Sequence, residues 1–192
     1  GPGRGALTSK LLQTGAKVIA VEKDDELFQF LKDTYKKGLE NGQLKLIHED
    51  ILESDLSKLV SGKYKLVANI PYNITGAIFK KFLETNNQPT KIVLLVQKEV
   101  AERIVARDKK ESILSISVKV YGEPRYVEKI LAGSFSPPPK VDSAIIAIEN
   151  ISKNFFQGFS EKDFFIMLRA GFKSKRKKLS SNLSTIFEKN RV

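Results

Sequence analysis

The sequence predicts an α/β fold in which a mostly parallel sheet carries an antiparallel hairpin at one edge and is followed by a small helical segment. Three patterns support this fold class. Short apolar runs alternate with amphipathic stretches over the first hundred residues, which is typical of strands connected by helices. Two alternating segments, 125–131 and 143–149, flank a proline-rich loop and indicate a hairpin. Beyond residue 150 the apolar residues recur at helical spacing.

The elements of the first half follow from apolar runs and apolar helix faces. Residues 17–21 form a buried apolar run that ends at Glu22. Residues 24–36 place Leu27 and Leu31 on one face of a helix. By the same criteria, the other predicted strands are 44–47, 64–68 and 92–96, and the other predicted helices are 8–14, 75–84 and 99–107.

The second half contains one ambiguous segment and two predicted helices. Residues 112–121 alternate like a strand, yet they follow a helix at a place where another helix would suit the fold, so both assignments stay open. After Asn150, apolar spacing predicts two amphipathic helices. Their apolar positions are Phe164, Leu168 and Phe172, then Leu179, Leu183 and Phe187.

Composition describes an ordinary globular protein. The 192 residues suffice for one domain, or one domain with a small appendage, and 41% are hydrophobic and 29% charged. The absence of cysteine excludes disulfides and thiolate metal sites and is compatible with a reducing cytoplasm. No apolar run approaches the roughly 20 residues of a membrane span, and no signal peptide is visible. We therefore expect a cytoplasmic monomer without membrane contact.

Charge is concentrated near the C-terminus. The net charge is +11, with a pI of about 9.7, which indicates a polyanionic partner. The last forty residues carry ten Lys and Arg against three acidic residues, so most of the excess lies there. The sequence therefore predicts a basic face built by the segment after residue 150.

An unusual motif ends the apolar run 64–68. In open α/β sheets, ligands bind at the carboxyl ends of the strands. The side-chain oxygen of Asn69 and the carbonyl of Ile70 can accept both protons of an exocyclic amine. Pro71 fixes the bend, and Tyr72 offers a ring for stacking on a base. The motif therefore predicts recognition of a planar base that carries an amine.

The N-terminal glycines and two acidic residues predict a second ligand. Gly1, Gly3 and Gly5 precede a predicted helix, where glycines let the backbone approach a ligand and point N–H groups at it. Glu22 ends one strand and can accept from ribose hydroxyls. Asp50 follows the next strand and can accept from an adenine amine. Together they favour an adenosine-containing cofactor.

Each of these features also has a plain structural alternative. The motif after residue 68 can be a strand-to-helix turn in which Tyr72 packs and Asn73 or Thr75 caps the next helix. Glu22 can be a solvated strand end, and Asp50 can be a helix N-cap before Ile51. The functional interpretation rests on the occurrence of all three features at successive strand ends.

In combination, the glycine turn, the two acids and Asn-Ile-Pro-Tyr resemble the S-adenosylmethionine-dependent amino-methyltransferases. Residues 135–144, Phe-Ser-Pro-Pro-Pro-Lys-Val-Asp-Ser-Ala, resemble the signature of the ribosomal RNA adenine dimethyltransferases. Residues 172–183 are similar to the basic helix near the start of that family's C-terminal domain. The Pro-Pro-Pro-Lys form is more similar to the branch that acts on the small ribosomal subunit than to the macrolide-resistance branch, which acts on the large one.

The resemblance implies a Rossmann-like class I methyltransferase that uses S-adenosylmethionine, releases S-adenosylhomocysteine and needs no metal. The glycines would hold the methionine end of the cofactor, Glu22 its ribose and Asp50 its adenine. The implied cofactor-binding residues are Gly1, Gly3, Gly5, Glu22, Lys23, Asp50, Ile51 and Asn69.

The resemblance also implies a catalytic site that works by positioning and electrostatics. Asn69 and the carbonyl of Ile70 would hold the amine of the target adenine. Tyr72 would stack on the base, and Phe135 would contact the base from the other side. The implied catalytic residues are Asn69, Ile70, Pro71, Tyr72 and Phe135.

The implied partner is small-subunit ribosomal RNA or a precursor of the small ribosomal subunit. RNA affinity would come from phosphate contacts that weaken with salt. The implied RNA-binding residues are Arg103, Arg107, Lys109, Lys110, Lys173, Lys175, Arg176, Lys177 and Lys178. The alternative for the cluster 173–178 is a solvated helix face.

The sequence departs from the family pattern at both ends, and at the second of them the helical C-terminal domain is expected to be truncated, because it stops early at Val192. The family has a strand and an N-terminal arm before the glycine turn, so we expect residues before Gly1 in the natural molecule and a hole in the sheet without them. We assign 1–150 to a methyltransferase domain that lacks its first strand, and 151–192 to the start of a helical, basic, RNA-binding domain.

Four other functions stay open on the sequence. They are a large-subunit methyltransferase of the macrolide-resistance type, a DNA adenine methyltransferase, a non-catalytic RNA-binding assembly factor with the same fold, and a nicotinamide-dependent dehydrogenase. The Phe-Ser-Pro-Pro-Pro block argues against the DNA enzyme. A dehydrogenase explains the glycines but leaves Asn-Ile-Pro-Tyr without a role.

Overall fold

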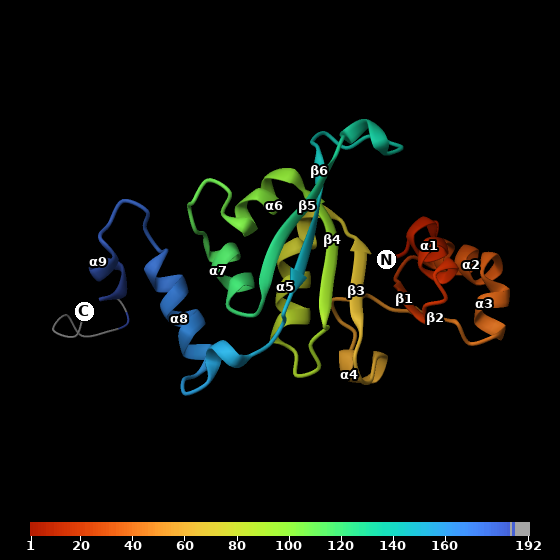
Figure 1. Ribbon diagram of the computed structural model, residues 1–192, viewed down its shortest axis with the longest axis horizontal. Coiled ribbons are helices and arrows are strands. Elements are labelled where there is room, and N and C mark those ends of the chain that lie inside the picture. The colour runs from red at the N-terminus through yellow and green to blue at the C-terminus, as the bar shows by residue number, and fades with distance from the viewer. Residues whose placement is uncertain (185, 187–192) are drawn as a thin grey trace.

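The computed structural model describes residues 1–184 and residue 186, and it has the predicted mixture of helices and strands (Figure 1). Its strands are β1 (Val18–Glu22), β2 (Leu44–His48), β3 (Lys65–Asn69), β4 (Lys91–Gln97), β5 (Glu123–Ile130) and β6 (Ser143–Glu149). Its helices are α1 (Ala6–Gln13), α2 (Asp25–Thr34), α3 (Lys36–Glu40), α4 (Leu56–Leu59), α5 (Thr75–Glu84), α6 (Lys98–Val105), α7 (Ile113–Lys119), α8 (Glu161–Gly171) and α9 (Leu179–Leu183). Single 3₁₀ turns are η1 (Tyr72–Ile74), η2 (Ala132–Ser134) and η3 (Asn154–Phe156).

The strands of the described residues form two sheets. β1 and β2 pair in parallel, and the other four strands lie in the order β3-β4-β6-β5. β3 and β4 are parallel, whereas β6 is antiparallel to both of its neighbours, so the predicted hairpin forms with β5 at the sheet edge. The expected hole matches the break between β1 and β3, beside which Figure 1 shows the N-terminus. That further residues precede Gly1 stays a prediction.

The core lies between the four-stranded sheet and helices α5, α6 and α7. β4 alternates buried and half-buried residues, and Ile92, Leu94 and Val96 are each 0% exposed. Phe79 and Phe82 of α5 are buried in the same cluster. Because the buried face of the sheet packs against these helices, the strand ends have fixed positions. No helix within 1–184 combines the length and apolar character that crossing a membrane requires.

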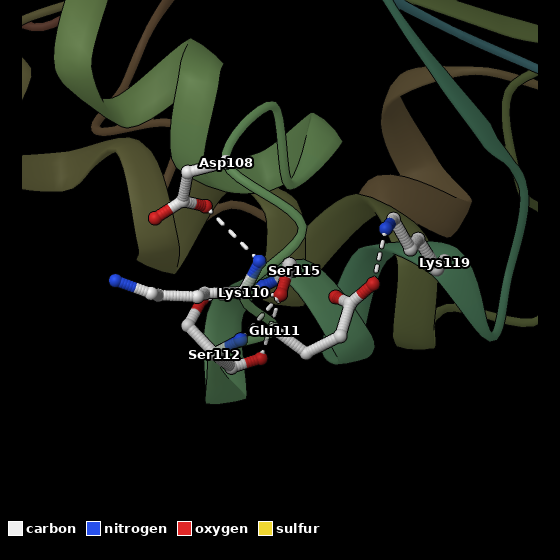
Figure 2. A network of polar contacts seen from close by, with 6 residues as sticks. All are labelled: Asp108, Lys110, Glu111, Ser112, Ser115 and Lys119. Carbon is white, nitrogen blue, oxygen red and sulfur yellow. Dashed lines mark hydrogen bonds and ion pairs between the residues drawn. The ribbon is translucent and has the colours of Figure 1, made fainter.

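The ambiguous segment 112–121 is a helix, α7, and its first turn explains why. The Ser112 hydroxyl accepts from the Ser115 N–H at 3.1 Å, and the Ser115 hydroxyl accepts from the Ser112 N–H at 2.6 Å. This reciprocal cap satisfies N–H groups at the helix start, and Figure 2 shows it beside the ion pair between Glu111 and Lys119. Cap chemistry therefore outweighs the alternating pattern.

The segment after residue 150 forms the two predicted helices, although α9 is short. The rings of Phe156 and Phe165 pack near Tyr121, which is 2% exposed, so α8 is joined to the first part of the chain by aromatic contacts. Ser160 caps α8 by accepting from the Asp163 N–H at 3.3 Å. The helical position predicted for Phe187 lies outside the described residues, and the domain boundary at residue 150 stays a prediction.

Candidate functional site

A cleft of about 570 Å³ lies at the carboxyl ends of β1, β2 and β3. It brings together the predicted cofactor-binding residues, except Gly5, and the predicted catalytic residues. Its lining comprises Gly1, Gly3, Val21, Glu22, Lys23, Glu49, Asp50, Ile51, Leu52, Asn69, Ile70, Pro71, Tyr72, Asn73, Ile74, Phe135, Pro137 and Pro139. Residues distant in sequence therefore share one cavity of a size typical of ligand sites.

The glycine turn is tied to the end of β1 by the Glu22 carboxylate. Glu22 is 5% exposed and accepts from the Gly3 N–H at 3.1 Å, the Lys23 N–H at 2.9 Å and the Asp24 N–H at 3.1 Å. A Cβ at Gly1 would collide with the same carboxylate, so the backbone approaches Glu22 closely. Glu22 is therefore not a solvated strand end. It holds the turn while it faces the cleft.

Gly5 stands behind the turn rather than in the cleft. It has φ +84° and immediately precedes α1, and its N–H donates to the Pro2 carbonyl at 2.9 Å. The hydroxyl of Tyr35 donates to the Gly5 carbonyl at 2.7 Å, and a Cβ at Gly5 would collide with the Tyr35 ring. The requirement for glycine here comes from the left-handed backbone and this close ring. No local pattern in the sequence predicts a role for Tyr35, because its contact with Gly5 spans 30 residues.

The turn after β2 is fixed by Asp50 and by a lysine from α5. The Asp50 carboxylate accepts from the Leu52 N–H at 2.9 Å and lies 3.5 Å from the Lys23 ammonium. These contacts, the Leu52 bond first, lower the pKa of Asp50 from its usual 3.8. Lys81 donates to the carbonyls of Leu52 at 3.1 Å and Ser54 at 2.6 Å, a role that sequence reasoning missed. The lowered pKa favours the ionised form of Asp50 at the edge of the cleft.

The Asn-Ile-Pro-Tyr motif leaves its polar group facing solvent. Asn69 is the exposed last residue of β3, and the hydrogen bonds of the described residues give its side chain no partner. Ile70 is 5% exposed and anchors the turn in the core. The Thr75 hydroxyl donates to the Tyr72 carbonyl at 3.0 Å, and α5 has no side-chain cap. The capping alternative is therefore wrong, and the Asn69 amide is available to a ligand.

Tyr72 and Phe135 come from different elements and line the same cleft. The hydroxyl of Tyr72 lies 2.7 Å from that of Ser143, the first residue of β6. Phe135 follows η2, and its loop is closed by Asp142, which accepts from the Ala132 N–H at 3.0 Å. Asp142 and Ser143 belong to the proline-rich signature 135–144, but the sequence predicted a role for neither of them.

The predicted RNA-binding residues fall into two groups. Arg103 and Arg107 on and after α6 form ion pairs with Glu99 and Glu102, respectively. With Lys110 and Lys175 they line a second cleft of about 510 Å³, whose lining also includes four carboxylates. The second group is exposed and forms no ion pair with another described residue. It comprises Lys109 of the α6–α7 loop and Lys173, Arg176, Lys177 and Lys178.

The basic cluster 173–178 is a loop between α8 and α9, so the expectation of a basic helix there is wrong. α8 ends at Gly171, and Asn182 donates to the carbonyls of Gly171 at 2.8 Å and Ser174 at 2.9 Å. Lys175 and Lys178 would be like charges three residues apart on a helix, which disfavours a helix there. Within the described ranges, no group of three or more His, Cys, Asp or Glu is arranged to hold a metal ion.

The comparisons with known proteins agree with one another. The sequence profile described as "Ribosomal RNA adenine dimethylase" matches residues 1–192. A "Ribosomal RNA small subunit methyltransferase A" of Dehalococcoides mccartyi (strain CBDB1) is 45% identical over 186 residues, which cover 96% of this chain and 63% of that protein. The chain thus spans less than two thirds of that relative's length.

Two solved structures share the arrangement of elements. The 23S rRNA methyltransferase ErmE superposes with a TM-score of 0.79 at 25% identity, covering 100% of this chain and 76% of that chain. A dimethyladenosine transferase from Plasmodium falciparum superposes with a TM-score of 0.76 at 32% identity, covering 96% of this chain and 65% of that chain.

Proposed function

The chain belongs to the ribosomal RNA adenine dimethylase family and has the class I methyltransferase fold, and from this premise we propose its activity. It transfers methyl groups from S-adenosylmethionine to the exocyclic amine of adenosines in small-subunit ribosomal RNA, giving dimethyladenosine during ribosome biogenesis. One observation carries the proposal. Asn69 and Tyr72 share a cleft with Glu22 and Asp50, so the amine site and the adenosine site adjoin.

The residues of the cleft fit S-adenosylmethionine. The Gly1 backbone lies so close to Glu22 that it has no room for a side chain. At Gly3, which also lines the cleft, the space that a side chain would occupy is open, and a ligand chain can pass there. Glu22 and Asp50 provide carboxylate oxygens at two strand ends, where ribose hydroxyls and an adenine amine find acceptors. Ile51 supplies an apolar contact for the adenine ring, and Lys23 borders the same space.

The chain's own groups would carry out the positioning of the target amine. When bound, S-adenosylmethionine supplies an electrophilic methyl group on a sulfonium. The Asn69 oxygen and the Ile70 carbonyl accept from the two protons of the adenine amine, which turns the nitrogen lone pair toward the cofactor side of the cleft. Because a ring amine is a weak nucleophile, these acceptors also stabilise the positive charge that develops on nitrogen.

Two aromatic side chains would hold the base outside its stack. The target base must leave its RNA stack to reach a cleft at the strand ends, and this costs a few kcal/mol. Stacking on Tyr72 returns roughly 1–3 kcal/mol, and Phe135, Pro137 and Pro139 line the same cleft. Pro71 keeps the motif rigid. Two methylations require that the same cleft admit the monomethylated amine.

The small subunit is the favoured substrate, and two alternatives remain to be tested. The "small subunit" name of the 45% identical relative supports it. A large-subunit activity is the second candidate, because the 23S rRNA methyltransferase ErmE has a TM-score of 0.79 to this chain. A non-catalytic assembly factor is the third. We expect the protein to act as a cytoplasmic monomer.

Cofactor binding tests the enzymatic proposal against the assembly-factor alternative. Isothermal titration of the protein with S-adenosylmethionine and with S-adenosylhomocysteine measures binding directly, and thermal unfolding with each compound measures stabilisation. The proposal predicts saturable binding and a higher Tm with both compounds. If the protein shows no binding of either compound and no stabilisation by either, the result would favour the assembly factor.

A further inference from the structure

The contact between Tyr72 and Ser143 joins two segments that are 71 residues apart in sequence, with 2.7 Å between the two hydroxyl oxygens. Tyr72 begins the short turn η1 after β3, whereas Ser143 begins β6. Ser143 is 0% exposed, and it is paired with Gln97 of β4 and Ile130 of β5. The hydroxyl of Ser143 is thus fixed by two neighbouring strands.

We propose that Ser143 is a positioning residue for methyl transfer, whose hydroxyl orients the Tyr72 ring for stacking on the target adenine. This inference rests on the proposed function. Tyr72 needs such an anchor because η1 is a single turn without a side-chain cap, at the edge of an open cleft. A hydrogen bond at the far end of the ring restrains both side-chain torsions, which packing at one face would leave free.

The residue beside Ser143 supports the loop that carries Phe135, the other aromatic residue of the cleft. Asp142 accepts from the Ala132 N–H at 3.0 Å and pairs with the Lys129 ammonium at 2.8 Å, which closes the loop that carries Phe135. The Asp142 carbonyl accepts from the Lys98 N–H at 3.0 Å. The start of β6 therefore contacts Tyr72 and the loop that carries Phe135, and it fixes these two aromatic residues relative to each other. This makes the separation between Tyr72 and Phe135 a property of a rigid strand.

Removing the Tyr72 hydroxyl and removing the Ser143 hydroxyl should lower the free energy of unfolding by unequal amounts. Tyr72→Phe keeps the ring but leaves the buried Ser143 hydroxyl without this partner, which is the costly case for stability. Ser143→Ala leaves the Tyr72 hydroxyl at a half-buried position that water can reach, so folding is little affected. The double variant removes both groups and recovers stability relative to Tyr72→Phe. Unfolding of the four proteins thus measures the bond independently of activity.

The decisive experiment combines this cycle with kinetics. Single-turnover methyl transfer to undermethylated small ribosomal subunits is measured at saturating S-adenosylmethionine, and cofactor affinity is measured by calorimetry. Ser143→Ala should slow transfer by about three- to tenfold, the effect of one hydrogen bond, without changing cofactor affinity. The double variant should be no slower than Tyr72→Phe. Ser143→Thr, which keeps a hydroxyl, should transfer faster than Ser143→Ala.

Tyr64→Phe provides the matched control. Tyr64 lies just before the opposite end of β3, and its hydroxyl donates to the Asn87 carbonyl at 2.9 Å, so the variant loses a phenol hydrogen bond far from the cleft. It should transfer methyl groups at the wild-type rate. A wild-type rate for Ser143→Ala, or independent effects in the double variant, would overturn the inference alone. A wild-type protein that transfers no methyl group would overturn the proposed function and this inference with it.

Discussion

The Gly3 N–H donates to the Glu22 carboxylate across 3.1 Å, and this bond makes the glycine turn and the end of β1 a single structure. Two further N–H groups, those of Lys23 and Asp24, share the other carboxylate oxygen. One buried acid therefore shapes the turn and faces the proposed ribose position. The predictions below separate this role from those of the base site and the RNA surface.

Replacing Glu22 should weaken cofactor binding. Glu22→Gln places an amide NH₂ against at least one N–H donor, so at least one charge-assisted bond is lost. Since such a bond is worth about 1.5–3 kcal/mol, we expect S-adenosylmethionine affinity to fall by about ten- to a hundredfold in calorimetry. Glu26→Gln removes the same charge from an exposed position of α2 and should bind normally. Equal affinity of the two variants would contradict the assignment.

Replacing Asn69 should separate chemistry from cofactor binding. Its side chain is exposed and has no partner among the described residues, so Asn69→Ala should unfold at the wild-type temperature. Loss of the amine acceptor should slow single-turnover transfer by about a hundredfold, as for other preorganised catalytic hydrogen bonds. Asn86→Ala, an exposed change in the α5–β4 loop, serves as the control. A matching loss of rate and cofactor affinity would argue against the assigned role.

Alanine at Gly5 should cost more than alanine at Gly15. Both glycines have positive φ, +84° and +79°, so each substitution carries the roughly 1–2 kcal/mol of a left-handed L-residue. Only at Gly5 does the new methyl group meet a ring, that of Tyr35. We expect Gly5→Ala to unfold at a lower denaturant concentration than Gly15→Ala and to bind S-adenosylmethionine less tightly. Indistinguishable variants would show that the Tyr35 contact does not hold the turn.

The salt dependence of RNA binding should distinguish the two groups of cations. Each phosphate contact contributes about 0.7–0.9 to the slope of log K against log salt. Lys177 is exposed and forms no ion pair with a described residue. Lys177→Ala should therefore reduce the slope by nearly the amount that one phosphate contact contributes. Arg103 is paired with Glu99, so Arg103→Ala should reduce the slope less. Filter binding at several salt concentrations measures the slope for both variants. A larger change in slope for Arg103→Ala than for Lys177→Ala would contradict the assignment of the phosphate contacts to the exposed cations.

The sequence was most informative where local chemistry coincides with a strand end. Glu22, Asp50 and Asn69 each follow an apolar run, and parallel strands bring such positions to one sheet edge. Their gathering in one cleft could therefore be predicted without knowledge of packing. The helix α5 was also predicted with its observed bounds, because its apolar face is continuous along the helix.

What could not be predicted depends on contacts between distant segments. Ser143 reaches Tyr72 across 71 residues, and Lys81 reaches Leu52 across 29, so neither role has a local signal. Segment 112–121 was ambiguous because its alternation competes with a capping box that only the folded backbone reveals. Residues 172–183 are similar to a basic helix of the family, but residues 173–178 form a loop, and the two Asn182 bonds to the Gly171 and Ser174 carbonyls hold it.

The central claim is that this cleft methylates adenine amines in small-subunit ribosomal RNA, and one measurement tests it most directly. The protein is incubated with methyl-labelled S-adenosylmethionine and, in parallel, with undermethylated small subunits, large subunits and duplex DNA, and the labelled nucleosides are then identified by mass spectrometry. The account predicts labelled dimethyladenosine from the small subunits and none from the other two, with the signal lost in Asn69→Ala. Label that appears only in large subunits or DNA, or an undiminished signal from Asn69→Ala, would contradict it.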